Sequence, residues 1–118
     1  MNIDRNSNNW KTLCRINAEA LKQIAERMGR QVGIQEIEFR STFLTNAVAN
    51  RTRDSLRERL ISKDGDHIFI MNNFHNLHHY DCLYSTFLEV TPENLTDIEC
   101  IFTEEATRMG GENVNWAS

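Results

Sequence analysis

The sequence has few residues that interrupt secondary structure, and it has no long apolar run. One proline and five glycines occur among its 118 residues, which argues against a linker-rich or disordered chain. The longest apolar run, Ile68 to Met71, is far too short to span a bilayer. The first residues also lack the basic and then apolar stretches of a secretion signal. We therefore expect a cytoplasmic protein that folds as one domain.

Cysteine is scarce, and its spacing does not suggest a disulfide framework. Cys14, Cys82 and Cys100 are odd in number and far apart, whereas a secreted framework usually has an even count. We expect three reduced thiols that pack as small apolar side chains.

Positive charge is nearly missing from the second half of the chain. Residues 61–118 contain two lysines or arginines against ten acidic residues, while residues 1–60 contain eleven against seven. The whole chain carries a net charge of −4. Because a domain this small cannot hold its halves far apart, we expect a basic face, an acidic face or both. Such faces attract charged partners without naming them.

Two segments in the first half have the apolar spacing of amphipathic helices. The first spans residues 10–28, between a cap at Asn9 and an end at Gly29. The second spans residues 44–61. Its expected apolar face consists of Leu44, Val48, Leu56 and Leu60.

The strongest helix start in the chain is Thr91 followed by Pro92, and that third helix is expected to end at Gly110. Three other segments have the β-branched and aromatic composition of strands: residues 32–39, 67–72 and 82–90. The middle one is apolar on both faces, which predicts a central strand.

Two of these segments leave alternatives open. In residues 32–39 the apolar alternation changes phase, which a bulge near Gln35 and Glu36 or a later strand start would explain. Residues 56–61 either complete the second helix or form a strand. That strand would pair with residues 67–71 through a turn at residues 63–66.

The order of elements is α-β-α-β-β-α. It indicates a small α+β domain with a three-stranded, mostly antiparallel sheet and helices packed on it. We expect the domain to span residues 10–111, after a flexible lead-in at residues 1–9 and before a tail at residues 112–118. Trp116 in that tail needs a docking place or a partner.

One stretch concentrates side chains that bind metals. His75, His79 and Cys82 form a candidate three-ligand site, since imidazole and thiolate bind zinc and related ions. The spacing matches no standard zinc pattern, so a plain surface loop is the simpler interpretation. A nucleophilic Cys82 beside Asp81 is disfavoured, because consecutive strand side chains point to opposite faces. We assign no catalytic residue and expect no cofactor, and a metal-dependent enzyme is one alternative.

Arginines on the expected second helix support another alternative. Arg51, Arg53 and Arg57, with Arg40 before the helix, are candidates for phosphate contacts in a nucleic-acid-binding protein. The acidic balance of the whole chain weighs against this role, because nonspecific DNA binding usually needs a basic domain.

The favoured function is binding to another macromolecule without catalysis. Small acidic domains without catalytic motifs are a common form of inhibitors, immunity proteins and adaptors, including those of phages and plasmids. The expected mechanism is occlusion of a basic site on a protein partner by an acidic surface with aromatic anchors. The candidate contact residues are Asp64, Asp66, Tyr80, Glu93, Asp97, Glu104, Glu105 and Trp116. Self-association is also possible, since a basic half on one copy can meet an acidic half on another.

Overall fold

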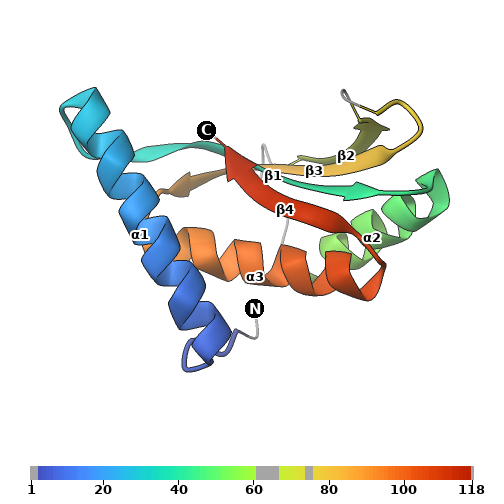
Figure 1. Ribbon diagram of the computed structural model, residues 1–118, viewed down its shortest axis with the longest axis horizontal. Coiled ribbons are helices and arrows are strands. Elements are labelled where there is room, and N and C mark those ends of the chain that lie inside the picture. The colour runs from blue at the N-terminus through green and yellow to red at the C-terminus, as the bar shows by residue number, and fades with distance from the viewer. Residues whose placement is uncertain (1–2, 61–66, 74–75, 118) are drawn as a thin grey trace.

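The computed structural model describes residues 3–60, 67–73 and 76–117, and it confirms a small α+β domain. Its elements follow the chain as α1 (Asn8–Met28), β1 (Ile34–Phe43), α2 (Asn46–Arg59), β2 (His67–Asn72), β3 (Tyr80–Glu89), α3 (Pro92–Arg108) and β4 (Glu112–Ala117). Figure 1 shows the sheet running above α3, with α1 and α2 at opposite ends of the molecule. The described chain has the three expected helices but four strands rather than three.

The four strands form one antiparallel sheet in the order β2-β3-β1-β4. From β1 onward the described elements run β-α-β-β-α-β, which together with this strand order is the ferredoxin-like, or split βαβ, topology. Helix α1 precedes this unit in the sequence and is an addition to it. This topology hosts many unrelated functions and by itself assigns none.

The expectation that residues 67–72 form a central strand is wrong, although β2 has the expected bounds. In the described part of the chain β2 pairs with β3 alone and lies at an edge of the sheet. Ile68 and Ile70 pack against the core, whereas Phe69 and Met71 point to the other face and are 41% and 46% exposed. The continuous apolar run therefore reflects one buried face and one exposed apolar face.

Most of the expected tail forms the fourth strand. β4 pairs antiparallel with β1 and places Trp116 opposite Phe39. The indole Nε1 of Trp116 donates a hydrogen bond to Asn17 Oδ1 of α1 at 2.9 Å. Trp116 therefore docks within its own domain.

The first and last helices begin at side-chain caps. α1 starts at Asn8, earlier than expected, because Ser7 and not Asn9 accepts the capping hydrogen bond. It ends as expected at Gly29, whose φ of 71° is the left-handed conformation that glycine adopts without strain. α3 has its expected cap at Thr91.

Helix α2 is shorter than the expected second helix. Its cap is Thr45, so Leu44 precedes the helix, is 72% exposed and does not join its buried face. The buried residues of α2 are Ala49, Thr52 and Leu56. The helix continues to Arg59, so the strand alternative for this stretch is wrong. Residue 61 and the turn expected at residues 63–66 lie outside the described residues.

The apolar pattern changes phase because Ile34 points to the face of the sheet away from the core, whereas Ile37 and Phe39 are buried on the core face. β1 begins at Ile34, and its register with β3 continues without a shift from Ile34 opposite Glu89 to Phe43 opposite Tyr80. No bulge is needed near Gln35. β3 begins at Tyr80, two residues before the expected start at residue 82.

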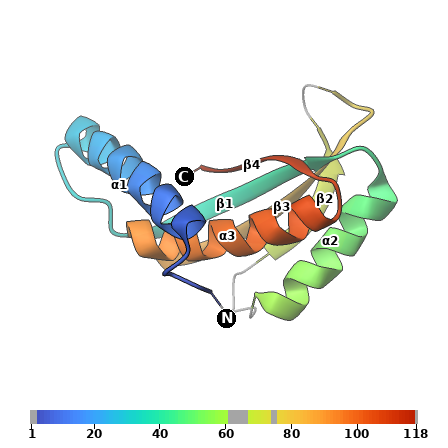
Figure 2. The same ribbon diagram turned by 60° about the horizontal axis from the view of Figure 1, so that its bottom comes forward.

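The helices pack on one face of the sheet and leave the other face open (Figure 2). α2 and α3 contact the strands, while α1 rests mainly on α3. The largest buried side chains of the core are Phe39, Phe43, Phe102, Ile37, Leu56, Leu95 and Ile101. Among the described residues, no helix combines the length and apolar character that crossing a membrane requires.

Candidate functional site

Asp97, a residue expected on the acidic surface, is buried instead. Its carboxylate accepts hydrogen bonds from Trp10 Nε1 at 2.9 Å and from the guanidinium of Arg5. The same guanidinium stacks over the Trp10 ring, with its Cζ 5.5 Å from the ring centroid. Asp97 therefore fixes the start of the chain onto α3 and is not available to a partner.

Glu105 is also buried, in a network that joins α2 to α3. Its carboxylate accepts hydrogen bonds from Ser55 Oγ, from Arg59 at 2.9 Å and from Arg108. Burial alone would raise the pKa of Glu105, but the hydrogen bonds from Ser55, Arg108 and Arg59 outweigh it and lower the pKa to about 2. Glu105 therefore stabilises the fold as a paired anion.

The two exposed acidic candidates that the structure describes, Glu93 and Glu104, lie far apart on α3. Glu93 is exposed at the first turn of α3, and Glu104 is 68% exposed near the other end of that helix, beside Arg59. Eleven residues of helix separate them by roughly 16 Å. Asp64 and Asp66 lie outside the described residues.

The two aromatic candidates are both half-buried. Tyr80 packs against the core at the start of β3, and Trp116 is held by Asn17. The indole N–H of Trp116 is therefore already used within the domain.

The arginines expected to contact phosphates are divided between two faces. Arg53 and Arg57 line a groove between α2 and β2, whereas Arg51 is exposed outside it. Arg40 lies on the open face of the sheet, where its guanidinium contacts Glu38 at 3.0 Å. The structure therefore does not bring the four arginines into one cluster.

One ligand of the candidate metal site lies in the core. Cys82 is fully buried, and burial raises the pKa of its thiol to about 12 despite the nearby charges of Arg53 and Arg57. His79 is half-buried, and His75 lies outside the described residues. Within the described ranges, no three histidine, cysteine or acidic side chains are placed to hold a metal ion.

We expect Cys82 to resist alkylation in the folded protein, because a buried thiol with a pKa of about 12 is protonated at about pH 8. Brief treatment with N-ethylmaleimide followed by peptide mass spectrometry should leave Cys82 unmodified. The same treatment in urea should label it fully. Rapid labelling of Cys82 in the native protein would contradict its burial.

The open face of the sheet carries several exposed apolar side chains. Four of the eight large hydrophobic side chains that are exposed in the described residues point to this face: Ile34, Phe69, Met71 and Phe87. Strand residues alternate between faces, so these positions lie opposite the core positions. None of the described helices covers them. Exposed apolar groups gathered on one face mark an interaction surface more often than scattered ones do.

Three carboxylates surround the two most exposed of these side chains. The register places Glu36 directly opposite Phe87 and Glu89 directly opposite Ile34, and Glu38 follows on β1. Opposite residues in an antiparallel pair have Cβ atoms about 5 Å apart. Ile34 and Phe87 are 76% and 55% exposed. We call these five residues the acidic patch.

The charges of the acidic patch are mostly uncompensated. Glu38 pairs with Arg40 at 3.0 Å. Among the described residues, the carboxylates of Glu36 and Glu89 have no cation within ion-pair distance. Adjacent like charges repel one another, so a cationic surface that docks here relieves the repulsion while the apolar side chains are buried.

Comparisons of this chain with protein-family models, curated proteins and solved structures find no match. The function of the acidic patch therefore has to be judged from its own chemistry.

The acidic patch could not be predicted from the sequence, because its residues come from two segments that are far apart in the chain. Residues 34, 36 and 38 alternate along β1, as residues 87 and 89 do along β3, and this spacing is the only local signal. That signal does not say which strands are neighbours or in which register they pair. Both facts are needed to place Phe87 beside Glu36.

Proposed function

We propose that this protein is a non-catalytic binding module that docks on a basic site of another protein through the acidic patch. By occupying that basic site, it would act as an inhibitor, an immunity protein or an adaptor. One observation carries the proposal: two exposed apolar side chains, Phe87 and Ile34, stand among carboxylates on a sheet face that no described helix covers.

The two kinds of side chain in the acidic patch have different tasks. Burial of Phe87 and Ile34 supplies affinity, since exposed aromatic and aliphatic groups that become fully desolvated dominate protein interfaces. The carboxylates of Glu36 and Glu89 orient the partner and speed its approach, which is the main effect of charge complementarity. A basic protein surface with an apolar pocket is the partner that fits both.

The proposed partner is still a basic protein, as the sequence favoured. The proposed contact surface is the acidic patch instead of the residues expected from the sequence. Asp97 and Glu105 serve as buried anions within the fold, so they are unsuited to a partner. The thiol of Cys82 is likewise enclosed by the core. Because these groups have structural tasks, the proposal assigns binding rather than catalysis to the protein.

Charge reversal tests the acidic patch against an equal change elsewhere. The double variant Glu36→Lys and Glu89→Lys alters the patch, while Glu93→Lys and Glu104→Lys makes the same change at two exposed positions of α3. Tagged wild type and both variants are used to capture partners from a lysate of cells that make the protein. We expect the patch variant to bind the captured protein at least about tenfold more weakly, with the α3 variant close to wild type.

Two results would count against the proposal. Equal capture by the two variants would show that the patch makes no contact. Loss of binding in the α3 variant alone would restore the surface expected from the sequence. Circular dichroism and thermal melting of each variant confirm that a loss of binding is not a loss of fold.

A further inference from the structure

The outer edge of β2 has the features of a second binding site. β2 is an edge strand, and no described segment pairs with the side that faces away from β3. An edge strand presents a row of unpaired backbone N–H and C=O groups, which can accept another strand. The edge of β2 is thus a template for an extended chain.

The outward backbone groups can be assigned to particular residues. Asn73 N donates to His79 O at 2.9 Å, so the backbone N–H of Asn73 faces the β3 side, and residues whose backbone faces the partner strand alternate along an antiparallel ladder. It follows that Ile68, Ile70 and Asn72 direct their N–H and C=O groups away from β3. An independent contact agrees, because Ile68 O accepts a hydrogen bond from the Arg57 side chain at 3.5 Å.

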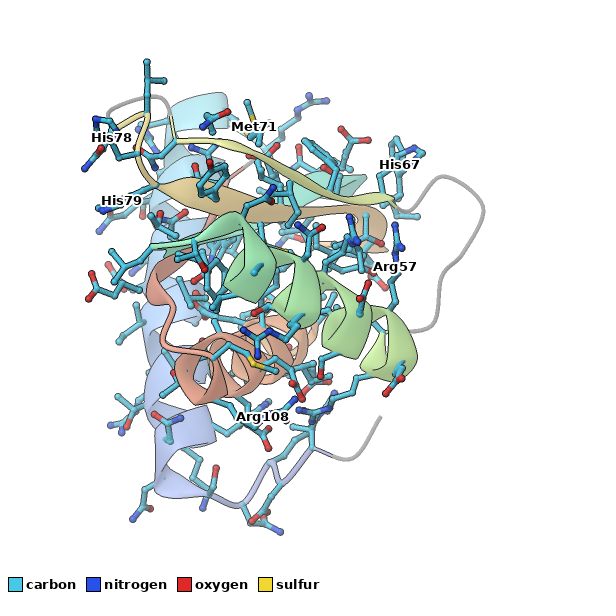
Figure 3. All side chains as sticks on the ribbon, turned by 90° about the vertical axis from the view of Figure 1, so that its right-hand side faces the viewer. Arg57, His67, Met71, His78, His79 and Arg108 are labelled. Carbon is cyan, nitrogen blue, oxygen red and sulfur yellow. The ribbon has the colours of Figure 1, made fainter. Side chains whose placement is uncertain are left out.

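A stripe of polar side chains on α2 runs beside this edge. The stripe consists of Asn46, Asn50, Arg53 and Arg57, which follow one another at helical spacing. Together with β2 it encloses a groove of about 510 Å³ that we call the α2–β2 groove. Figure 3 shows the arrangement, with Arg57 lying between α2 and the His67 end of β2. The groove has a helix on one side and an open strand edge on the other.

The two arginines of the α2–β2 groove keep unused hydrogen-bonding capacity. Among the described residues, Asp54 is the only carboxylate partner of Arg53, at 3.4 Å, and Arg57 has none. A guanidinium has five N–H donors in a fork that matches a carboxylate. An incoming carboxylate can therefore bind here without displacing a strong internal ion pair.

The other face of the edge is apolar. Phe69 and Met71 alternate with the groove-facing residues of β2 and lie exposed on the open face of the sheet. A strand added to β2 would direct one set of side chains toward α2 and the alternate set toward Phe69 and Met71. The groove therefore selects for acidic residues at one set of positions and apolar residues at the other.

We propose that the α2–β2 groove binds an extended segment of a protein with alternating acidic and apolar residues, which adds to β2 as a fifth strand. The backbone of the segment pairs with Ile68, Ile70 and Asn72, and its carboxylates bind Arg53 and Arg57. This site is separate from the acidic patch and does not depend on the function proposed for it.

The row of backbone groups favours a peptide over a nucleic acid. Each outward N–H of β2 alternates with an outward carbonyl, and a peptide strand supplies the matching acceptor and donor at the same spacing. A phosphate backbone accepts hydrogen bonds but has no N–H to offer the carbonyls. Arg51, which would extend a phosphate track along α2, lies outside the groove.

Fluorescence anisotropy with a defined probe tests the site. The probe is a fluorescein-labelled peptide of about eight residues that alternates valine and glutamate, long enough to pair along a typical strand. We expect saturable binding that weakens about tenfold in Arg53→Gln and in Arg57→Gln but is unchanged in Arg51→Gln, the matched control. Backbone N-methylation of the peptide at alternate residues should abolish binding in one phase and spare it in the other.

Other outcomes would overturn the proposal. These are no binding of the probe by the wild-type protein at up to about 1 mM, equal losses in all three arginine variants, or equal tolerance of both methylation phases. Tighter binding of a single-stranded DNA oligomer than of the peptide, lost in the same groove variants, would assign the arginines to nucleic acid instead. Binding that fails while capture through Glu36 and Glu89 succeeds would reject this site and leave the acidic patch standing.

Discussion

Replacing Glu105 by glutamine will lower the free energy of unfolding by roughly 3 kcal/mol near pH 7. The carboxylate is buried and holds Ser55, Arg59 and Arg108 together between α2 and α3. A glutamine fills the same space but leaves the two guanidinium groups without their shared anion. Breaking a buried pair by removing one partner is among the most destabilising changes in folded proteins. Urea unfolding followed by circular dichroism measures the loss.

The pH dependence of stability distinguishes the charge of Glu105 from its packing. Its pKa falls from the ordinary 4.5 to about 2 in the folded protein, so its contribution is fully present above about pH 4.5. It disappears as the pH falls from about 4.5 to about 2. The difference corresponds to roughly 3 kcal/mol of the wild-type stability. In Glu105→Gln this component of acid destabilisation should be absent.

Glu104 provides the control for this prediction. It neighbours Glu105 and also contacts Arg59, at 3.3 Å, but its side chain is largely exposed. Exposed ion pairs contribute between about 0 and 1 kcal/mol. We therefore expect Glu104→Gln to change stability by less than about 1 kcal/mol. Equal effects of the two substitutions would contradict the network described for Glu105.

Replacing Gly111 by alanine will destabilise the protein by about 2 kcal/mol through a steric clash. A Cβ at this position would lie 2.5 Å from Cε1 of Phe43 and 2.9 Å from Oγ of Ser41. Both neighbours are buried, so neither side chain can move aside without disturbing the core. The clash falls where the chain leaves α3 and enters β4, so Trp116 should loosen from β1. Thermal melting by tryptophan fluorescence should show a midpoint lower by about 8 °C.

Gly33→Ala is the matched control for Gly111→Ala. Apart from the two adjacent residues, no atom of the described chain lies within 4 Å of a Cβ built at Gly33. The substitution adds the same methyl group and removes the same backbone freedom from the unfolded chain, so we expect a change within about 0.5 kcal/mol or a small gain. If the two alanine variants melted together, Phe43 would not pack against Gly111 as the structure shows.

Local sequence signals predict the elements that carry their own start and stop residues. Thr91 and Pro92 begin α3, Gly29 ends α1, and β2 has the expected bounds. These succeed because caps and short apolar runs act on their own segments. The sequence did not predict β4, for the opposite reason. Half of its six residues are polar, and the strand forms because it pairs with β1 and docks Trp116 on α1.

The candidate surfaces are harder to predict than the elements. Charge counts cannot distinguish an exposed carboxylate from one enclosed by distant partners, and Glu105 binds Arg59 and Ser55 of another helix. The position of a strand in the sheet is equally hard to predict: the apolar run of β2 favoured a central strand, but β2 lies at an edge. The acidic patch and the α2–β2 groove both arise from strand order and register, which no local pattern specifies.

Site-specific photo-cross-linking tests most directly whether the acidic patch is the docking surface. The photoreactive residue p-benzoylphenylalanine replaces Phe87 in one variant and Ile16, an exposed apolar residue of α1, in another. Both are irradiated in a lysate of cells that make the protein. We expect one discrete protein adduct from position 87, suppressed by untagged wild type but not by the Glu36→Lys and Glu89→Lys variant. Adducts from position 16 and none from position 87 would contradict the proposed docking surface.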